Sequence, residues 1–199
     1  MISKLLELDK DLFIYLNSFH TPWLDPVMYY MSETFVWSPL YILLLYLIYK
    51  NYQKDTWLIL IGITLTVLFS DQLTTSVMKP FFMRLRPSHE PLLSNTVHVV
   101  NGYRSGGLYG FASSHAADTF GAAMFLWLLL KPHYRWSVLL FLWAALVTYT
   151  RIYLGVHYPG DVLAGAAIGI FFGWIFYTSF KLIKGRIDGR KSDHLTNVT

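Results

Sequence analysis

The chain has 199 residues with a formal net charge of +4; 54% of the residues are hydrophobic and only 14% are charged. This composition is far from that of a soluble single domain and indicates a protein with several membrane spans. The sequence contains no cysteine, which excludes structural disulfides and thiolate metal sites.

The first segment, residues 2–19, alternates Leu, Ile and Phe with Lys, Glu and Asp at helical spacing. Because it carries too many charges to be buried in lipid, the pattern predicts an amphipathic helix that lies in the membrane interface. The charges continue through the stretch that would form the apolar core of a signal peptide, and no small-residue cleavage site follows. We therefore do not interpret this segment as a signal peptide.

Five apolar runs follow, and a bilayer takes about 20 residues to cross. We place the spans at residues 32–49, 57–78, 116–130, 136–153 and 162–183; the region around Trp23 adds a sixth if it also inserts. The sequence thus predicts an all-α, polytopic transmembrane helical bundle of five to six spans over residues 1–183. A basic, mobile cytoplasmic tail is expected at residues 184–199.

The polar segment at residues 79–115 is the longest between spans, and the basic residues on either side of the membrane set its orientation. If this segment faces outward, the inner side holds 9 of the 16 Lys and Arg residues. Most of the remaining basic residues lie in this loop or in the turn near residue 151. Positive charges on the outer side need a local reason, and a bound anion supplies one.

The segment Lys79 to Pro87 begins where the second span ends, and its two prolines are expected to fix the chain as it leaves the helix. Lys79 offers a compact charge and Arg86 a planar fork, which together suit a tetrahedral oxyanion such as phosphate. The alternative is that both side chains simply extend to the lipid headgroups.

A second polar group, Ser113-Ser114-His115, leads directly into the third span. The amides and hydroxyls at a helix N-terminus can bind an anion, although Ser113 can equally be an ordinary helix cap.

The third group is Arg151 to Asp161, where Gly155, Pro159 and Gly160 interrupt the helix between two apolar runs. Arg151 lies at a helix end, His157 in the turn and Asp161 at the next helix start. Asp161 can cap that helix and also face the ring of His157. Clustered polar groups near lipid usually mark a site, so the three segments together predict one.

These three segments resemble the signatures of the type 2 phosphatidic acid phosphatase (PAP2) superfamily: Lys-x6-Arg-Pro, Pro-Ser-Gly-His and Ser-Arg-x5-His-x3-Asp. Lys79 to Pro87 matches the first completely, and Arg151 to Asp161 matches the third except that Thr150 replaces Ser. In the second signature, Ala112 replaces Pro and Ser114 replaces Gly. A side chain at position 114 either crowds the phosphate or adds a hydroxyl contact.

The resemblance implies a phosphatase without metal or cofactor. His157 would attack phosphorus and form a phosphohistidine, Asp161 would hold the proton on its other ring nitrogen, and His115 would protonate the leaving group and then activate water. The phosphate oxygens would be bound by the following residues: Lys79, Arg86, Ser113, Ser114 and Arg151.

Two carboxylates within the spans lie near these motifs. Asp71 is either a hydrogen-bond hub with Gln72, Thr74 or Thr75, or a partner that orients a catalytic cation. Asp118 follows His115 by three residues on the same helix face, which fits either support of that histidine or plain packing.

Residues in the outer loop have other expected roles. Arg84 and Arg104 are expected to be solvated or to steer anionic headgroups, and residues 102–110 could form a lid. His89 and His98 are not expected to bind a metal, since no further ligands complete a set.

The expected partners are the membrane and a lipid phosphate, with no nucleic acid. The resemblance implies a bacterial cytoplasmic-membrane protein with an exterior-facing site, acting on undecaprenyl diphosphate, phosphatidate, phosphatidylglycerophosphate or lipid A. Two alternatives are a vanadate-dependent haloperoxidase and a lipid-phosphate binding or transport protein without turnover.

Overall fold

The structure, a computed structural model, describes residues 2–100, 103 and 107–196. These residues form helices and connecting turns, with one isolated β-bridge between Leu85 and Tyr109. The helices are α1 (Ile2–Asn17), α2 (Leu24–Ser32), α3 (Ser38–Tyr52), α4 (Thr56–Gln72), α5 (Lys79–Phe82), α6 (Ser114–Leu130), α7 (Leu139–Tyr153) and α8 (Pro159–Thr196). Short 3₁₀ turns η1 (Thr34–Trp37), η2 (Gln53–Asp55), η4 (Pro87–His89), η5 (Pro91–Leu93) and η7 (Arg135–Val138) connect them, and η3 (Leu73–Met78) is π-helical.

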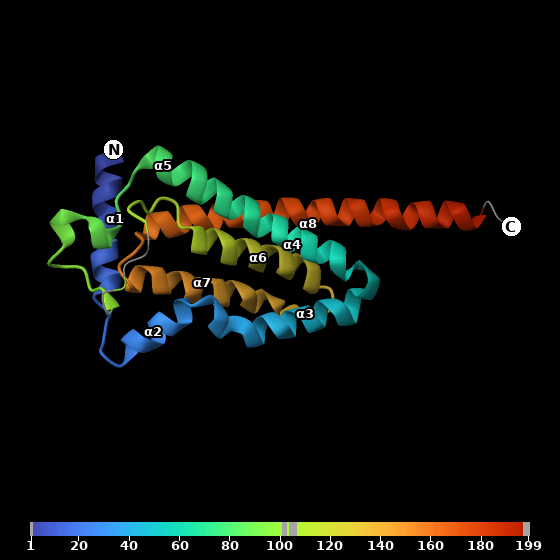
Figure 1. The fold of residues 1–199 in the computed structure, drawn as a ribbon, viewed down its shortest axis with the longest axis horizontal. Helices are drawn as coiled ribbons and strands as arrows, with labels where there is room; N and C mark the ends of the chain where they lie inside the picture. Colours follow the sequence, from blue (N-terminus) through green and yellow to red (C-terminus); the bar gives the residue numbers. More distant parts are fainter. Residues whose placement is uncertain (1, 101–102, 104–106, 197–199) are drawn as a thin grey trace.

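The prediction of an all-α membrane bundle is confirmed. In the described part of the chain, three helical stretches are long and apolar enough to cross a membrane: Thr34–Phe82, Arg135–Tyr153 and Pro159–Gly189. The first stretch reverses at Gln53, whose φ is 39°, so α3 and α4 run antiparallel in Figure 1. Together with the shorter apolar α6, the five expected spans correspond to α3, α4, α6, α7 and α8.

Two expected boundaries differ from the structure. The helix of α2 has nine residues, about 14 Å at 1.5 Å per residue, and is too short to add a sixth span. Helix α8, which contains the last expected span, continues past Ile183 to Thr196 and extends beyond the other helices (Figure 1). Residues 197–199 of the expected tail lie outside the described residues.

The second span also continues further than predicted, through η3 and α5 to Phe82. We expected Pro80 to end the helix, because proline lacks the N–H that bonds to the residue four positions earlier. In the structure the wider π-helical turn comes directly before α5 and changes the hydrogen-bonding register there. Lys79 therefore lies on a helix rather than in a loop.

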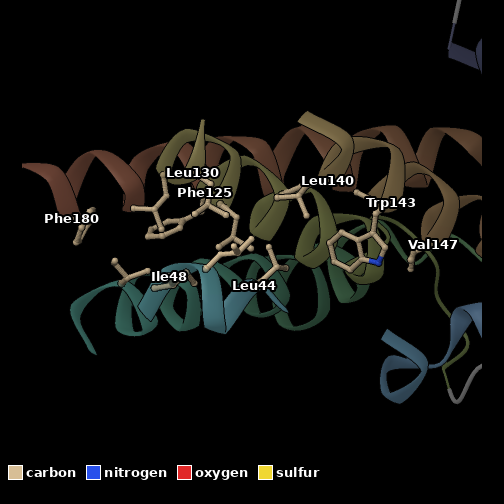
Figure 2. Packing of buried hydrophobic residues seen from close by; sticks show 14 residues of the cluster. Leu44, Ile48, Phe125, Leu130, Leu140, Trp143, Val147 and Phe180 are labelled. Carbon is tan, nitrogen blue, oxygen red and sulfur yellow. The ribbon is translucent and has the colours of Figure 1, made fainter. Parts of the chain in front are cut away.

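The core lies between α3, α4, α6, α7 and α8 (Figure 2). Leu44 and Ile48 on α3 face Phe125 and Leu130 on α6. Trp143 on α7 belongs to the same cluster and lies beside Val147, at the end away from Phe180. In lipid the hydrophobic effect gives helices little reason to associate, so close packing and dispersion must hold this bundle together.

The contact between α6 and α8 is built on glycine. A Cβ at Gly165 would overlap the carbonyl oxygen of Ser113, one at Gly169 that of Ala117, and one at Gly173 that of Gly121. The three glycines are four residues apart and so occupy one face of α8. Their missing side chains let the two backbones touch, as small residues do between membrane helices.

The N-terminal helix α1 lies across one end of the bundle, nearly perpendicular to the other helices (Figure 1). Its inner face is anchored by Phe13, which is fully buried and packs edge-on against Tyr158 at 5.3 Å. The buried Asn17 amide donates to the carbonyl oxygens of Ile152 and Tyr153, at 3.1 and 2.8 Å, and so satisfies the C-terminal end of α7. The predicted amphipathic helix is thus also a docked part of the fold.

Candidate active site

The three sequence motifs meet at the end of the bundle that α1 covers. There a polar cavity of about 600 Å³ lies between α5, the N-terminus of α6 and the turn before α8. Its lining includes both imidazoles and all three motif cations: Lys79, Arg86, Ser114, His115, Arg151 and His157. Tyr103 and residues 107–109 also line the wall; residues 102 and 104–106 of the expected lid lie outside the described residues.

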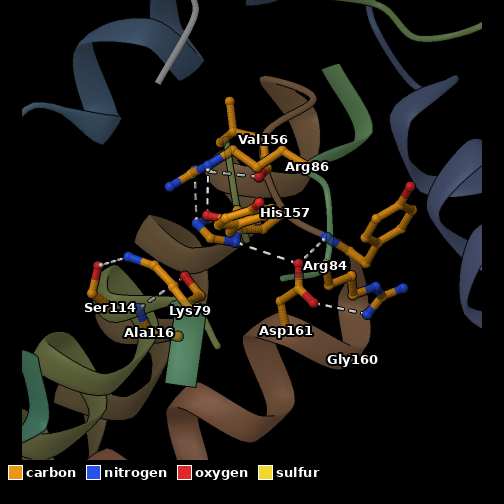
Figure 3. A network of polar contacts seen from close by, with 12 residues as sticks. Lys79, Arg84, Arg86, Ser114, Ala116, Val156, His157, Gly160 and Asp161 are labelled. Atoms are coloured by element: carbon orange, nitrogen blue, oxygen red, sulfur yellow. Dashed lines mark hydrogen bonds and ion pairs between the residues drawn. The ribbon is translucent and has the colours of Figure 1, made fainter. Parts of the chain in front are cut away.

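The orientation of His157 is fixed by charged groups on both sides of its ring (Figure 3). Arg86 Nη1 lies 3.2 Å from Nε2, and Asp161 Oδ2 lies 3.5 Å from Nδ1, within ion-pair distance although not aligned as a hydrogen bond. Asp161 is fully buried, and its Oδ2 also accepts from the Tyr158 amide at 3.0 Å. The carboxylate therefore caps α8 and faces the histidine, as the sequence suggested.

The protonation state of this pair follows from its surroundings. Burial, and then the charge of Arg151, lowers the pKa of Arg86 to about 10, so the guanidinium remains charged at neutral pH and donates to Nε2. Burial and the cations Arg86, Arg151 and Lys79 lower the pKa of His157 well below its usual value. The neutral ring thus carries its proton on Nδ1, facing Asp161, and its lone pair on Nε2.

The Lys79 ammonium group is positioned by a series of hydrogen bonds along α4, η3 and α5. Its Nζ donates to Thr75 Oγ1 at 3.3 Å, and Thr75 in turn donates to Asp71 Oδ1 at 3.0 Å. On the other side Nζ donates to Ser114 Oγ at 3.2 Å. Asp71 therefore accepts from Thr75, one of its expected partners, and reaches Lys79 only through that hydroxyl. The hydroxyl of Ser114, which departs from the family motif, faces this cation.

Arg151 is 2% exposed and makes two hydrogen bonds of 3.1 Å to the Tyr103 hydroxyl. Its Nε is buried and has no hydrogen-bond partner among the described residues. A buried, unpaired donor of a charged group is costly, and a phosphate oxygen would satisfy it.

Of the two roles that the sequence allows for Ser113, the structure shows the helix cap. Its hydroxyl caps α6 by accepting from the Ala116 amide at 3.5 Å, and its own amide donates to the Asp161 carbonyl at 3.0 Å. Ser113 is fully buried and does not line the polar cavity, so neither group is available to phosphate. Ser114, the first residue of α6, remains in the cavity wall, where helix amides lack intrahelical partners.

Sequence reasoning missed the role of Arg84 and the involvement of Asp9. Arg84 donates to Asp161 Oδ1 at 2.8 Å and to Asp9 Oδ2 at 2.7 Å, and its guanidinium lies over the Tyr158 ring at 4.0 Å. Asp9 also accepts from the Gly160 amide at 2.7 Å. Arg84 therefore connects α1 to the catalytic carboxylate instead of steering headgroups. Arg104, assigned the same role, lies outside the described residues.

His115 lines the polar cavity opposite His157 and also borders a second, apolar cavity that Asp118 shares. Asp118 forms no ion pair with Lys79 in the part of the chain that the structure describes, and its Oδ1 is buried without a partner there. Within the same residues no group of three or more His, Asp or Glu side chains is placed to hold a metal ion.

A buried histidine whose Nε2 is unprotonated, in a cavity with three cations and a second histidine, is equipped to transfer a phosphoryl group. Set at the end of an apolar helical bundle, the site defines an integral membrane phosphatase. The chain belongs to the PAP2 superfamily, which matches residues 61–184.

Individual relatives agree with this membership. The chain is 43% identical to a lipid A 4'-phosphatase of Bacteroides thetaiotaomicron, covering 89% of this chain and 79% of that protein. It is 38% identical to a lipid A 4'-phosphatase of Porphyromonas gingivalis, covering 92% and 77%. The crystal structure of a transmembrane PAP2-type phosphatidylglycerolphosphate phosphatase from Bacillus subtilis has the same fold, with a TM-score of 0.65, 21% identity and coverage of 90% and 88%.

Proposed function

We propose that this membrane lipid phosphatase hydrolyses a phosphate monoester of lipid A or a closely related glycolipid and releases inorganic phosphate. The observation that carries the proposal is the pairing at His157, where Nε2 faces the cations of the polar cavity and Nδ1 faces Asp161. The choice of lipid A within the substrate class is supported by the 43% and 38% identical relatives.

The reaction has two steps. His157 Nε2 forms a bond to phosphorus while the bond from phosphorus to the ester oxygen breaks, and His115 gives a proton to the departing oxygen. Burial and the neighbouring cations lower the pKa of His115 to about 3, so it holds this proton only beside the anionic phosphate, which offsets those cations. Neutral His115 then takes a proton from water, whose oxygen attacks the phosphohistidine and releases inorganic phosphate. Lys79, Arg86 and Arg151 neutralise the phosphate oxygens throughout, and Asp161 stabilises the charged ring of the intermediate.

Phosphate release in detergent micelles tests the proposal. The native chain should hydrolyse lipid A in the presence of EDTA, and His157→Gln should reduce the rate by at least about 1,000-fold. Acid-labile ³²P should remain on the native chain after rapid quenching and be absent from the variant. Equal rates in the two proteins would remove His157 as nucleophile. Faster turnover of undecaprenyl diphosphate or phosphatidate in parallel assays would overturn the choice of lipid A.

The proposal includes a bacterial cytoplasmic membrane with the active site facing outward. Among the basic residues near the site, Lys79, Arg84, Arg86 and Arg151 are engaged in the contacts described above, which leaves most of the free positive charge at the opposite end. Because the chain has no cysteine, single Cys substitutions report topology directly. In spheroplasts an impermeant maleimide should label Leu92→Cys near the site and spare Lys54→Cys at the opposite end; the reverse pattern would invert the orientation.

A further inference from the structure

An apolar cavity of about 570 Å³ lies beside the catalytic one, between α3, α4, α6 and α7. Its wall is almost entirely hydrocarbon, with Leu44, Ile63 and Val147 among the lining side chains. Cavities of this size and polarity typically bind small apolar ligands or parts of larger ones. Leu45 on α3 and Leu60 on α4 line the cavity and are also exposed, so it opens sideways between these two helices, toward lipid.

The two cavities meet at His115, which lines both. A substrate whose phosphate lies among Lys79, Arg86 and Arg151 therefore has its ester oxygen near His115 and its apolar part directed into the second cavity. A hydrocarbon chain can enter from the bilayer through the gap between α3 and α4 without passing through water.

Asp118 is the acidic residue in this largely apolar wall, which also includes Ser32 and Thr34. It lies one helical turn after His115 on α6, and its buried Oδ1 accepts no hydrogen bond from any residue that the structure describes. The neighbouring hydroxyl of Thr119 does not serve it, because that hydroxyl donates to the His115 carbonyl at 2.7 Å. A carboxylate oxygen in hydrocarbon is costly unless a donor reaches it, and the cavity gives such a donor access.

The geometry points to this cavity as the binding site of one acyl chain of the substrate, with Asp118 accepting a hydrogen bond from a hydroxyl or amide N–H near the head of that chain. This inference rests on the proposed lipid phosphatase function and narrows its substrate class. Hydroxylated or amide-linked acyl chains carry such a donor, whereas plain fatty acyl and isoprenoid chains do not.

The first experiment blocks the cavity. Ala122 lines it on α6, so Ala122→Phe places a ring in the path of the chain. The matched control is Ala145→Phe on α7, which introduces the same ring at an exposed position outside the cavity. We expect Ala122→Phe to lower kcat/KM for a long-chain lipid phosphate about 10- to 100-fold more than for a short-chain soluble phosphomonoester, because misplacement of the reacting group is costly. Equal effects on both substrates, or equal effects in both variants, would overturn the chain site.

The second experiment tests Asp118 with two synthetic sugar phosphates whose acyl chains are ester-linked and of equal length, so that neither lipid has an amide N–H. One carries 3-hydroxyacyl chains and the other plain acyl chains. The native enzyme should prefer the hydroxylated lipid by about 10-fold or more, since a site built for a hydrogen bond discriminates against an analogue that lacks the donor. Asp118→Leu should reduce this preference to within about 2-fold. An unchanged preference in the variant, or no preference in the native enzyme, would refute the role of Asp118.

The two proposals fail in different ways. If the native chain hydrolyses neither the lipids nor the soluble phosphomonoester, the phosphatase function itself is refuted. If the soluble ester is hydrolysed while chain length and hydroxylation make no difference to either variant, only the acyl-chain site is refuted. Should Asp118→Leu not fold, Asp118→Ala, which also removes the acceptor oxygens, repeats the measurement and should likewise reduce the preference to within about 2-fold.

Discussion

Removing the side-chain charge of Arg84 is the most direct test of how the N-terminal helix supports catalysis. Arg84 bridges Asp9 on α1 and Asp161 on α8, with N–O distances of 2.7 and 2.8 Å. In Arg84→Met, the fully buried Asp161 keeps only its contact with the Tyr158 amide and the longer contact with His157. We expect the Asp161 carboxylate to shift or to take up a proton, so that it no longer keeps the proton of His157 on Nδ1.

The size of the effect can be bounded. Removing one partner of a buried ion pair costs about 3–5 kcal/mol. The Arg84 side chain is 18% exposed, so water compensates in part and a loss of roughly 2–3 kcal/mol in stability is reasonable. Because Arg84 acts only through Asp161, kcat should fall by about 10- to 100-fold, less than the effect of losing the carboxylate itself. KM should change little, since Arg84 does not line the phosphate cavity.

The assay is steady-state hydrolysis of lipid phosphate by detergent-purified protein, with thermal unfolding measured in parallel. Arg84→Lys should recover part of kcat, because one ammonium group can neutralise Asp161 but cannot bridge both carboxylates. Lys4→Met, which removes an exposed charge from the same end of the molecule, is the control. A folded Arg84→Met enzyme with native kcat and an increased KM would refute the reasoning and favour direct contact with the headgroup.

Three further changes test the other supports of the site. Thr75→Val should weaken inhibition by inorganic phosphate about 3- to 10-fold, because Lys79 loses one hydrogen bond; Ser76→Ala, which breaks a similar bond to Gln72 on an exposed face, should not. Gly169→Ala should lower stability by about 1–3 kcal/mol because its methyl group meets the Ala117 carbonyl, whereas Gly185→Ala, with open space around it, should not, in a comparison of melting temperatures. His157 has a lowered pKa, so the unfolded chain takes up its proton near pH 6.5 while the folded chain does not. The native protein should therefore lose about 1.4 kcal/mol per pH unit below 6.5 relative to His157→Gln, and parallel stability curves from pH 7.5 to 5 would contradict this.

The sequence was sufficient for the bundle and for most of the site, because both are encoded locally. Long apolar runs identify spans whatever their neighbours, and the motif spacing placed Lys79, Arg86, Arg151 and His157 at helix ends on one side. Those ends do converge on a single cavity.

The features that the sequence did not predict depend on contacts between distant residues, or on residues that can play more than one role. Asp9 and Arg84 are 75 positions apart, and no periodicity relates them. A serine before a helix looks the same whether its hydroxyl caps the helix or binds an anion, so the sequence left both roles of Ser113 open. A proline ends most helices that it follows. The helix continues through Pro80 here because a π-helical turn comes before it, and no clear pattern in the sequence predicts that turn.

The glycine contact between α6 and α8 has a consequence for how such an enzyme can change its substrate. His115 lies in the first turn of α6 and Asp161 in the first turn of α8. Because the main chains of the two helices are in contact, no rotamer change can absorb an altered spacing. The opposite side of the molecule, where α3 and α4 stand apart around a hollow, has room to accommodate new shapes. Selection for a different lipid should therefore accumulate replacements on α3 and α4, while the half of the molecule that performs the chemistry stays fixed.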